Sequence, residues 1–256
     1  MSYLRLAGLF IVILSAPRTW GQENATTAAD PQAAVGIYEC IYTDEAIVID
    51  GKDDEAAWKK ARPVGDFTIS WAKGSKRKPP TATRAKLLWG KDYLYFFAQM
   101  EDSDLYATVK EHDGMTWHND VFEMFLKPVA DNPGYYEFQV SPANTRLDIF
   151  FPRRAAGGYD RFKSDGKFDF QSAVVLDGTL NDWRDTDRGW NVEGKISWKD
   201  FDRTGGGPKA NDIWKFGLFR YDYSIAFEGP AQSTNAPLRS GSFHTHEEYA
   251  PIRFVK

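Results

Sequence analysis

The sequence predicts an all-β protein, an antiparallel β-sandwich with one short helix near the N-terminus. Runs of alternating apolar and polar residues are separated by Gly, Pro, Asn and Asp along most of the chain, which is the pattern of strands joined by turns. Only residues 53–61 combine residues of good helical propensity. The 256 residues are 42% hydrophobic, enough for one large domain or two small ones, and no internal repeat or second domain boundary divides them.

The first 34 residues are predicted to precede the folded domain. A positively charged start, an apolar run too short to span a bilayer and a polar exit follow one another in residues 1–21, an order typical of a secretory signal peptide. Residues 22–34 are rich in Ala, Thr and Gln and are expected to form a flexible lead-in. The sandwich domain then covers 35–256, and the protein is expected to be secreted or periplasmic.

Strands are expected in order along this domain, and Trp58 is expected to attach the helix at 53–61 to the core. Their boundaries follow from runs rich in β-branched and aromatic residues that end at turn residues. The lone Cys40 cannot form an internal disulfide and is predicted to be a buried thiol. The expected strands are 37–42, 46–49, 67–71, 85–89, 93–100, 116–126, 135–142, 146–151, 171–176, 190–198, 213–223 and 252–255.

A hairpin near the middle of the chain places polar side chains on one face. Its first strand, 116–126, carries the acid Glu123 between apolar residues, and its return strand, 135–142, follows after several turn residues. Matching the apolar faces of the two strands puts Glu123 opposite Gln139. Glu123, Gln139 and Ser141 then share one face, where the acid meets either solvent or a ligand. The other face is expected to pack on the core through Phe122, Met124, Tyr136, Phe138 and Val140.

The charge of the chain argues against two classes of partner. The net charge is −4, and the single basic cluster consists of Lys73, Lys76, Arg77 and Lys78, so neither a nucleic acid nor an anionic membrane is expected as partner. Nine Trp and twelve Tyr provide ample aromatic surface. The expected partner is therefore a neutral molecule that aromatic side chains can contact.

Six groups of residues, in this order along 47–254, resemble carbohydrate-binding module family 9. The resemblance implies an antiparallel β-sandwich that binds an oligosaccharide or polysaccharide without catalysis, of a type often attached to xylan- or cellulose-degrading glycoside hydrolases. It implies recognition of a plant-type or microbial polysaccharide or its chain ends, in support of carbohydrate catabolism, and some members hold structural calcium. The groups are Ile49–Gly51 with Asp54–Trp58, Leu87–Trp89 with Tyr93–Tyr95, Asn119–Phe125, Tyr135–Val140, Trp190–Glu193 and Phe243–His244.

The resemblance gives roles to five residues. Trp117 is similar to the first of two aromatic residues that clamp a sugar ring, and Glu123 to an acid that binds its hydroxyls. Gln139 and Ser141 fall where sugar-binding members can carry an arginine and an asparagine, and Phe243 falls where they can carry the second clamping tryptophan. Such a site is physically reasonable, because a sugar ring has an apolar face that can lie on an aromatic ring and a rim of hydroxyls that needs donors and acceptors.

Each of these five residues also has a purely structural interpretation. Trp117 could plug the edge of the sandwich, Glu123 could be an exposed acid paired with a basic residue, and Phe243 could pack in the core. Gln139 and Ser141 could lie on a solvated face.

Three other functions would use different residues. A glycoside hydrolase acting on O-glycosyl bonds needs two carboxylates about 5–9.5 Å apart, and Glu123 and Glu137 could share a face. A metal site could use His244 and His246, which lie on one face if 244–247 is a strand. A haem-binding sandwich needs axial ligands, for which the candidates are Met100, Met115, His112 and His118. The sequence favours the non-catalytic binding protein over all three.

Overall fold

The structure, a computed structural model, describes residues 36–72, 77–163 and 168–256. The signal peptide and the lead-in predicted from the sequence lie outside the described residues, as do Lys73 and Lys76 of the basic cluster. No helix in the described ranges is long and apolar enough to cross a membrane.

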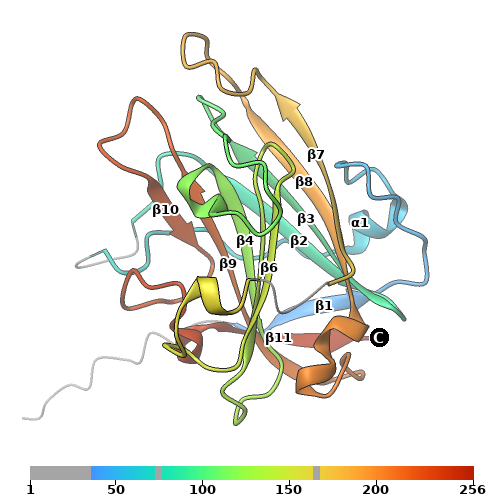
Figure 1. Cartoon of the computed structure of the whole chain (residues 1–256). Helices are drawn as coiled ribbons and strands as arrows, with labels where there is room; N and C mark the ends of the chain where they lie inside the picture. Colours follow the sequence, from blue (N-terminus) through green and yellow to red (C-terminus); the bar gives the residue numbers. More distant parts are fainter. Residues whose placement is uncertain (1–35, 73–76, 164–167) are drawn as a thin grey trace, which may run out of the picture. The chain divides into compact units, whose positions relative to one another are not determined.

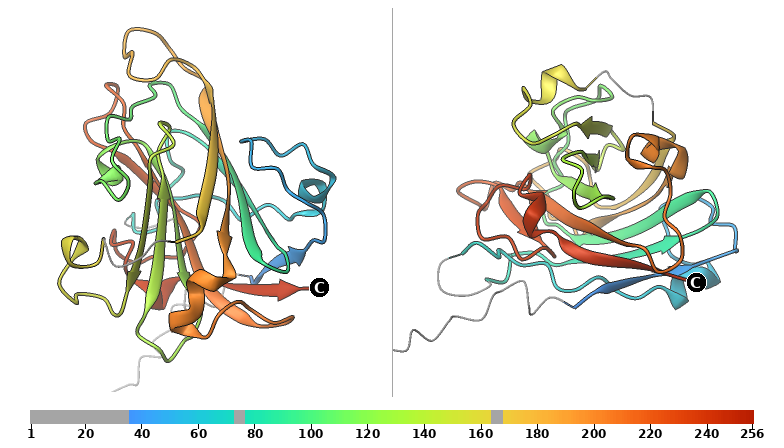
Figure 2. Two further views of the ribbon diagram at one scale, coloured as in Figure 1. Left: turned by 45° about the vertical axis from the view of Figure 1, so that its right-hand side comes forward. Right: turned by 90° about the horizontal axis from the view of Figure 1, so that it is seen from below.

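The described residues form eleven strands in one mixed sheet, in the order β6-β5-β4-β9-β11-β1-β2-β3-β8-β7 with β10 paired to β9 (Figure 1). The two ends of the sheet turn toward each other (Figure 2) and enclose the core as a sandwich does, so the predicted fold class is confirmed. The strands are β1 Tyr38–Tyr42, β2 Thr83–Trp89, β3 Tyr93–Glu101, β4 Val121–Lys127, β5 Tyr135–Val140, β6 Arg146–Phe151, β7 Phe170–Asp177, β8 Gly189–Ser197, β9 Ile213–Asp222, β10 Ala231–Thr234 and β11 Ala250–Val255.

Strand β1 is the exception to the expected antiparallel pairing. It pairs in parallel with both β11 and β2, while every other ladder is antiparallel. Parallel neighbours cannot be joined by a tight hairpin and need a longer crossover. The chain between β1 and β2 supplies that crossover, and it contains the one described α-helix, α1.

The predicted helix is present but shorter than expected. It spans Ala56–Lys60, and Trp58 is fully buried on it, with its ring 6.1 Å from that of Phe97 on β3. The Trp58 indole N–H also donates to the Glu193 carboxylate at 2.9 Å. The remaining described helices are short 3-10 turns: η2 Thr116–His118, η3 Tyr159–Arg161, η4 Trp198–Thr204 and η5 His246–Glu248.

Two predicted strands are not strands in the structure. Residues 46–49 form no ladder, and 67–71 make only isolated bridges. Both segments are apolar because they cover other elements, as the burial of Ile47 and Phe67 shows. Strand β10 was not predicted, because its sequence Ala-Gln-Ser-Thr is short and lacks alternating apolar residues.

Cys40 is buried and forms no disulfide, as expected.

The hairpin of β4 and β5 has the predicted register, with Glu123 opposite Gln139. Aromatic contacts join its inner face to the other end of the sheet, such as that between Phe138 and Phe170 on β7, whose ring centroids are 5.3 Å apart. The outer face of this part of the sheet is also covered, by loops after β6 and after β10. A second cluster of buried apolar residues forms there, and it contains Phe125, Tyr135, Leu147, Ile149, Phe151, Phe162, Phe219, Ala236, Leu238, Phe243 and Tyr249.

Candidate functional site

A pocket of about 470 Å³ opens on the outer face of the β4–β5 hairpin. Its volume falls in the range of about 300–1,000 Å³ that is usual for small-molecule sites. Strands β4, β5 and β9 form its floor, and the loops that cover the second apolar cluster form its walls. The lining residues are Trp117, Glu123, Phe125, Tyr135, Glu137, Gln139, Phe151, Arg154, Ala155, Ala156, Gly158, Tyr159, Tyr221, Gly241, Ser242, Phe243 and His244.

Four of the five residues singled out in the sequence line this pocket, and Ser141 does not. Trp117, Glu123, Gln139 and Phe243 come from three separate segments of the chain, which the fold brings together. Ser141 lies just beyond the end of β5, is fully buried, and accepts a hydrogen bond from the backbone N–H of Thr145 at 3.3 Å. Its side chain stabilises the turn that leads to β6.

Glu123 is buried without a polar partner. Its side chain lies in the middle of the sheet, between β5 and β9, and the residue is only 2% exposed. Its carboxyl forms no hydrogen bond or ion pair with any described residue. Burial raises the pKa of Glu123 well above its usual value, and the nearby charge of Glu137 raises it further. The alternative of an exposed acid paired with a basic residue is therefore wrong.

Glu137 and Gln139 form a short hydrogen-bonded chain beside Glu123. The Gln139 side-chain amide donates from Nε2 to Glu137 Oε1, and its Oε1 accepts from the Thr116 hydroxyl. This arrangement fixes the direction in which the amide points. Burial raises the pKa of Glu137 to about 8, although the hydrogen bond from Gln139 opposes the shift. Alternation along β5 places Glu137 in the same pocket as Glu123, as the hydrolase alternative required.

The aromatic walls differ in how much of each ring a ligand could reach. Trp117 on η2 is partly exposed, and its ring lies edge-on to that of Tyr159, with centroids 4.8 Å apart and an interplanar angle of 84°. Phe243 is only 5% exposed and is stacked on Phe219, with ring centroids 4.4 Å apart. Trp117 therefore offers a ring for contact, whereas Phe243 serves mainly to close the wall.

The rim carries a histidine and an arginine that the sequence did not assign to this site. His244 Nδ1 is 3.0 Å from the Tyr135 hydroxyl, and burial lowers the pKa of His244 to about 4, so the ring is neutral near pH 7. The Arg154 guanidinium donates two hydrogen bonds to the Glu247 carboxylate, at 2.6 and 2.8 Å. Arg154 lies in a loop without alternating residues, so no sequence pattern pointed to it.

The residues proposed for a metal or haem site do not converge. His244 and His246 do not lie on a strand, because 246–248 form η5, and both rings pack on Tyr135, at 6.0 and 5.2 Å between centroids. None of the four haem candidates lines the pocket, and Met100 belongs to the main core.

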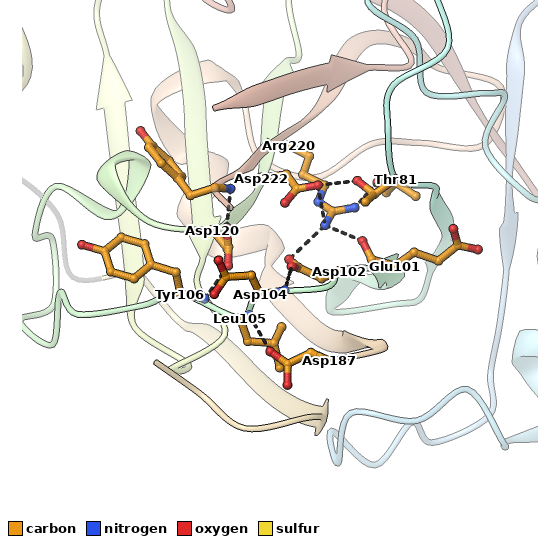
Figure 3. Close-up of polar contacts among 12 residues, drawn as sticks. Thr81, Glu101, Asp102, Asp104, Leu105, Tyr106, Asp120, Asp187, Arg220 and Asp222 are labelled. Carbon is orange, nitrogen blue, oxygen red and sulfur yellow. Dashed lines mark hydrogen bonds and ion pairs between the residues drawn. The ribbon is translucent and has the colours of Figure 1, made fainter. Parts of the chain in front are cut away.

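A cluster of buried acids lies at the end of β9, outside the pocket (Figure 3). Asp102, Asp120 and Asp222 each bring one oxygen within 4.8 Å of the others. The Arg220 guanidinium is 3.1 Å from Asp102 Oδ2 and 3.3 Å from Asp222 Oδ2, while Asp222 Oδ1 has no partner among the described residues. Burial raises the pKa of Asp102 to about 7 and that of Asp120 to about 9.

These oxygens suit the hard cation that the family resemblance implies. Calcium takes six to eight oxygen ligands, with carboxylates prominent among them, and here three buried carboxyl groups share one guanidinium. A second group, His112, Asp113 and Asp148, mixes a ring nitrogen with carboxylates, and His112 Nε2 is 3.1 Å from Asp148 Oδ2. The three aspartates near Arg220 therefore fit calcium better.

Comparison with solved structures shows the fold. A carbohydrate-binding module of family 9 from Caldicellulosiruptor kristjanssonii in complex with cellotriose is 17% identical, with a TM-score of 0.57, covering 86% of this chain and 94% of that one. The module in complex with glucose is 17% identical, with a TM-score of 0.55 and coverages of 84% and 95%. A candidate carbohydrate-binding protein from Bacteroides uniformis is 14% identical, with a TM-score of 0.67 and coverages of 84% and 97%.

Comparison with models of protein families shows to which family the chain belongs. No curated protein matches it. A family model described as carbohydrate family 9 binding domain-like matches residues 49–224, which is more than half of the chain and confirms the resemblance inferred from the sequence. The chain therefore belongs to the carbohydrate family 9 binding domain-like family.

Proposed function

We propose that the protein binds an oligosaccharide or polysaccharide in the pocket on the outer face of the β4–β5 hairpin. The observation that carries this proposal is the Glu123 carboxyl, which is 2% exposed, has no partner in the described part of the chain and lines an aromatic pocket. The Glu123 carboxyl faces the pocket, so a ligand that supplies donors can give it the hydrogen bonds that no described residue makes.

A sugar meets the requirements of both the floor and the walls. Its hydroxyls can form hydrogen bonds with the carboxyls of Glu123 and Glu137, each worth about 0.5–1.5 kcal/mol, or about 1.5–3 kcal/mol where the carboxyl is ionised. Its apolar ring face can lie on the exposed part of Trp117. The bound cellotriose and glucose in two similar structures support glucose-based chains as the first ligands to test.

Titration calorimetry on the purified chain tests this function. The ligands are glucose, cellotriose, xylotriose and a broader glycan array, and Trp183→Ala serves as control, because Trp183 is 62% exposed and lies outside the pocket. Binding by the wild type and by the control supports the proposal, and no binding to any glycan contradicts it. Released sugar in the same samples would instead favour a hydrolase that uses Glu123 and Glu137.

The proposal also covers the export of the protein and the enzyme that it acts with. Residues 1–21 have the order of a secretory signal peptide, and we infer that the protein acts outside the cytoplasm, together with a glycoside hydrolase. Mass spectrometry of the protein recovered from its native host tests the export, since removal of the predicted signal leaves a new N-terminus near residue 22.

A structural calcium ion is proposed for the cluster of Asp102, Asp120 and Asp222. The support is the oxygen-only donor set and the Asp222 Oδ1 atom that lacks a hydrogen bond to any described residue. The ion would neutralise the acids that Arg220 does not, and so stabilise the junction of β3 and β9.

A further inference from the structure

Among the described residues, the floor of the pocket carries two acids and no positive charge. Glu123 lies opposite Gln139, and Glu137 precedes Gln139 by two residues on the same face of β5. Between the acids, Gln139 contributes a neutral amide where a cation would balance them. Among the described lining residues Arg154 is the only lysine or arginine, and its guanidinium is held by Glu247 at 2.6 and 2.8 Å.

The histidine of the rim does not supply the missing charge. His244 is packed between aromatic rings, including that of Phe125 at 5.4 Å, and burial lowers its pKa to about 4. The described residues around the pocket therefore leave the two carboxyls with only each other and one amide hydrogen bond.

A neutral sugar would only partly satisfy the carboxyls of Glu123 and Glu137. Its hydroxyls donate hydrogen bonds, but they bring no charge, and two buried carboxylates in one site oppose each other's ionisation. An ammonium group brings three N–H donors together with a positive charge. Side chains that are diagonal neighbours across an antiparallel pair lie close enough for one such group to reach both acids. The ring face of Trp117 would attract the same cation, whereas the ring of Tyr159 already has the Lys163 ammonium group 5.1 Å from its centroid.

We propose that the pocket selects a sugar that carries an ammonium group, such as a glucosamine unit of a partly deacetylated polysaccharide, over the neutral sugar of the same shape. This inference rests on the proposed carbohydrate binding, and it follows from the pairing of Glu123 with Glu137 in an aromatic pocket whose described lining offers no free cation. The ammonium group lies between the two carboxylates, and the sugar ring lies against Trp117.

Three trisaccharides with the same backbone test the inference by titration calorimetry. The glucosamine trimer, cellotriose and the N-acetylglucosamine trimer differ only at carbon 2 of each sugar ring. This carbon carries an ammonium group, a hydroxyl group or an acetamide group, respectively. At a pH where the amine is protonated, the ammonium charge lowers the raised pKa values of the two acids, and its binding releases a carboxyl proton to solvent. The glucosamine trimer should then bind roughly tenfold more tightly than cellotriose, the gain expected of a charge-assisted contact.

Two variants locate the preference in the pocket. Glu137→Gln keeps the shape and the hydrogen bond from Gln139, and it should reduce the preference for the glucosamine trimer to within roughly threefold, with a smaller change for cellotriose. Glu228→Gln removes the same charge from an exposed position outside the pocket and should keep the full preference. A preference that persists in Glu137→Gln would overturn the inference.

The outcomes separate this inference from the proposed function. If cellotriose binds as tightly as the glucosamine trimer or more tightly, the inference is overturned and carbohydrate binding stands. If the glucosamine trimer does not bind, the inference is overturned, and the neutral trimers decide whether the pocket binds carbohydrate. Should Glu137→Gln fail to fold, the comparison of the three trimers on the wild type decides alone.

Discussion

Gln139 donates its side-chain amide to the Glu137 carboxyl while it lies directly opposite Glu123 on the neighbouring strand. One amide thus stands between two buried acids at the bottom of an aromatic pocket. The amide can satisfy one carboxyl and leaves the other without a partner among the described residues. A ligand with donor groups can therefore give Glu123 the hydrogen bonds that no described residue supplies.

A pH series on the ligand-free protein will test the state of this acid pair. The pKa of Glu137 rises from the usual 4.5 to about 8 on folding, so the folded state binds the proton more tightly than the unfolded state does. The stability from this group is then fully present below about pH 4.5 and is lost as the pH rises through about 8. Thermal melts should show a falling Tm across this window, with a shallower fall for Glu137→Gln.

The comparison must be made between variants, because Asp102 and Asp148 act in the same direction. Burial raises the pKa of each to about 7, so the wild type will lose stability with rising pH for several reasons. Glu228→Gln, at an exposed position, should reproduce the wild-type slope. A Glu137→Gln slope equal to that of the wild type would show that Glu137 ionises in the folded protein as freely as in the unfolded chain.

Trp117→Ala should weaken sugar binding by roughly tenfold or more and leave the fold intact. The ring is partly exposed at the pocket wall, so its loss removes a ligand contact. The backbone at this position is retained, since the Trp117 carbonyl still accepts the Tyr223 hydroxyl at 2.8 Å. Calorimetry and thermal melts check both statements. Equal affinity in the mutant and the wild type would show that Trp117 only packs against Tyr159.

The sequence could predict what depends on local alternation. Phe122 and Met124 alternate with Glu123 along β4, and this alternation alone placed Glu123 opposite Gln139 and on the face away from the main core. The same reasoning could not tell whether that face meets water. Its burial depends on loops that follow β6 and β10, far along the chain, and nothing in the pattern of β4 refers to them.

Features made by distant segments escaped prediction. Tyr159 closes the pocket from the loop after β6, and its position depends on a hydrogen bond to the Asp113 carbonyl, 46 residues away in sequence. The parallel pairing of β1 depends on where β11 and β2 lie, because a strand's own sequence does not specify the direction of its neighbours. Phe243 was placed near the site by resemblance, but its stacking on Phe219 emerged only from the structure.

Calcium should raise the Tm of the protein, and a chelator should lower it. Asp102, Asp120 and Asp222 lie together with only Arg220 as countercharge among the described residues. An ion that binds only the folded state stabilises it by about 2.7 kcal/mol at a concentration one hundred times its Kd. Thermal melts with excess calcium and with EDTA measure the shift.

Two variants assign the calcium effect to this cluster. Asp222→Asn should abolish the shift, and Asp185→Asn, at an exposed acid outside the cluster, should keep it. A wild-type Tm that is the same in calcium and in EDTA would mean that no calcium ion stabilises the three acids.

Glu123→Gln should weaken sugar binding by roughly 1–2 kcal/mol, because the amide keeps the shape of the acid and loses the charge that strengthens its hydrogen bonds. Since burial raises the pKa of Glu123 well above its usual value, ionised Glu123 costs stability in the folded protein, and glutamine removes that ionisation. The Tm of the variant relative to that of the wild type should therefore increase as the pH rises. Ser141→Ala, which alters a buried residue of the same sheet outside the pocket, should leave affinity unchanged. Calorimetric titration beside thermal melts measures both quantities, and an unaltered affinity in Glu123→Gln would remove Glu123 from the binding site.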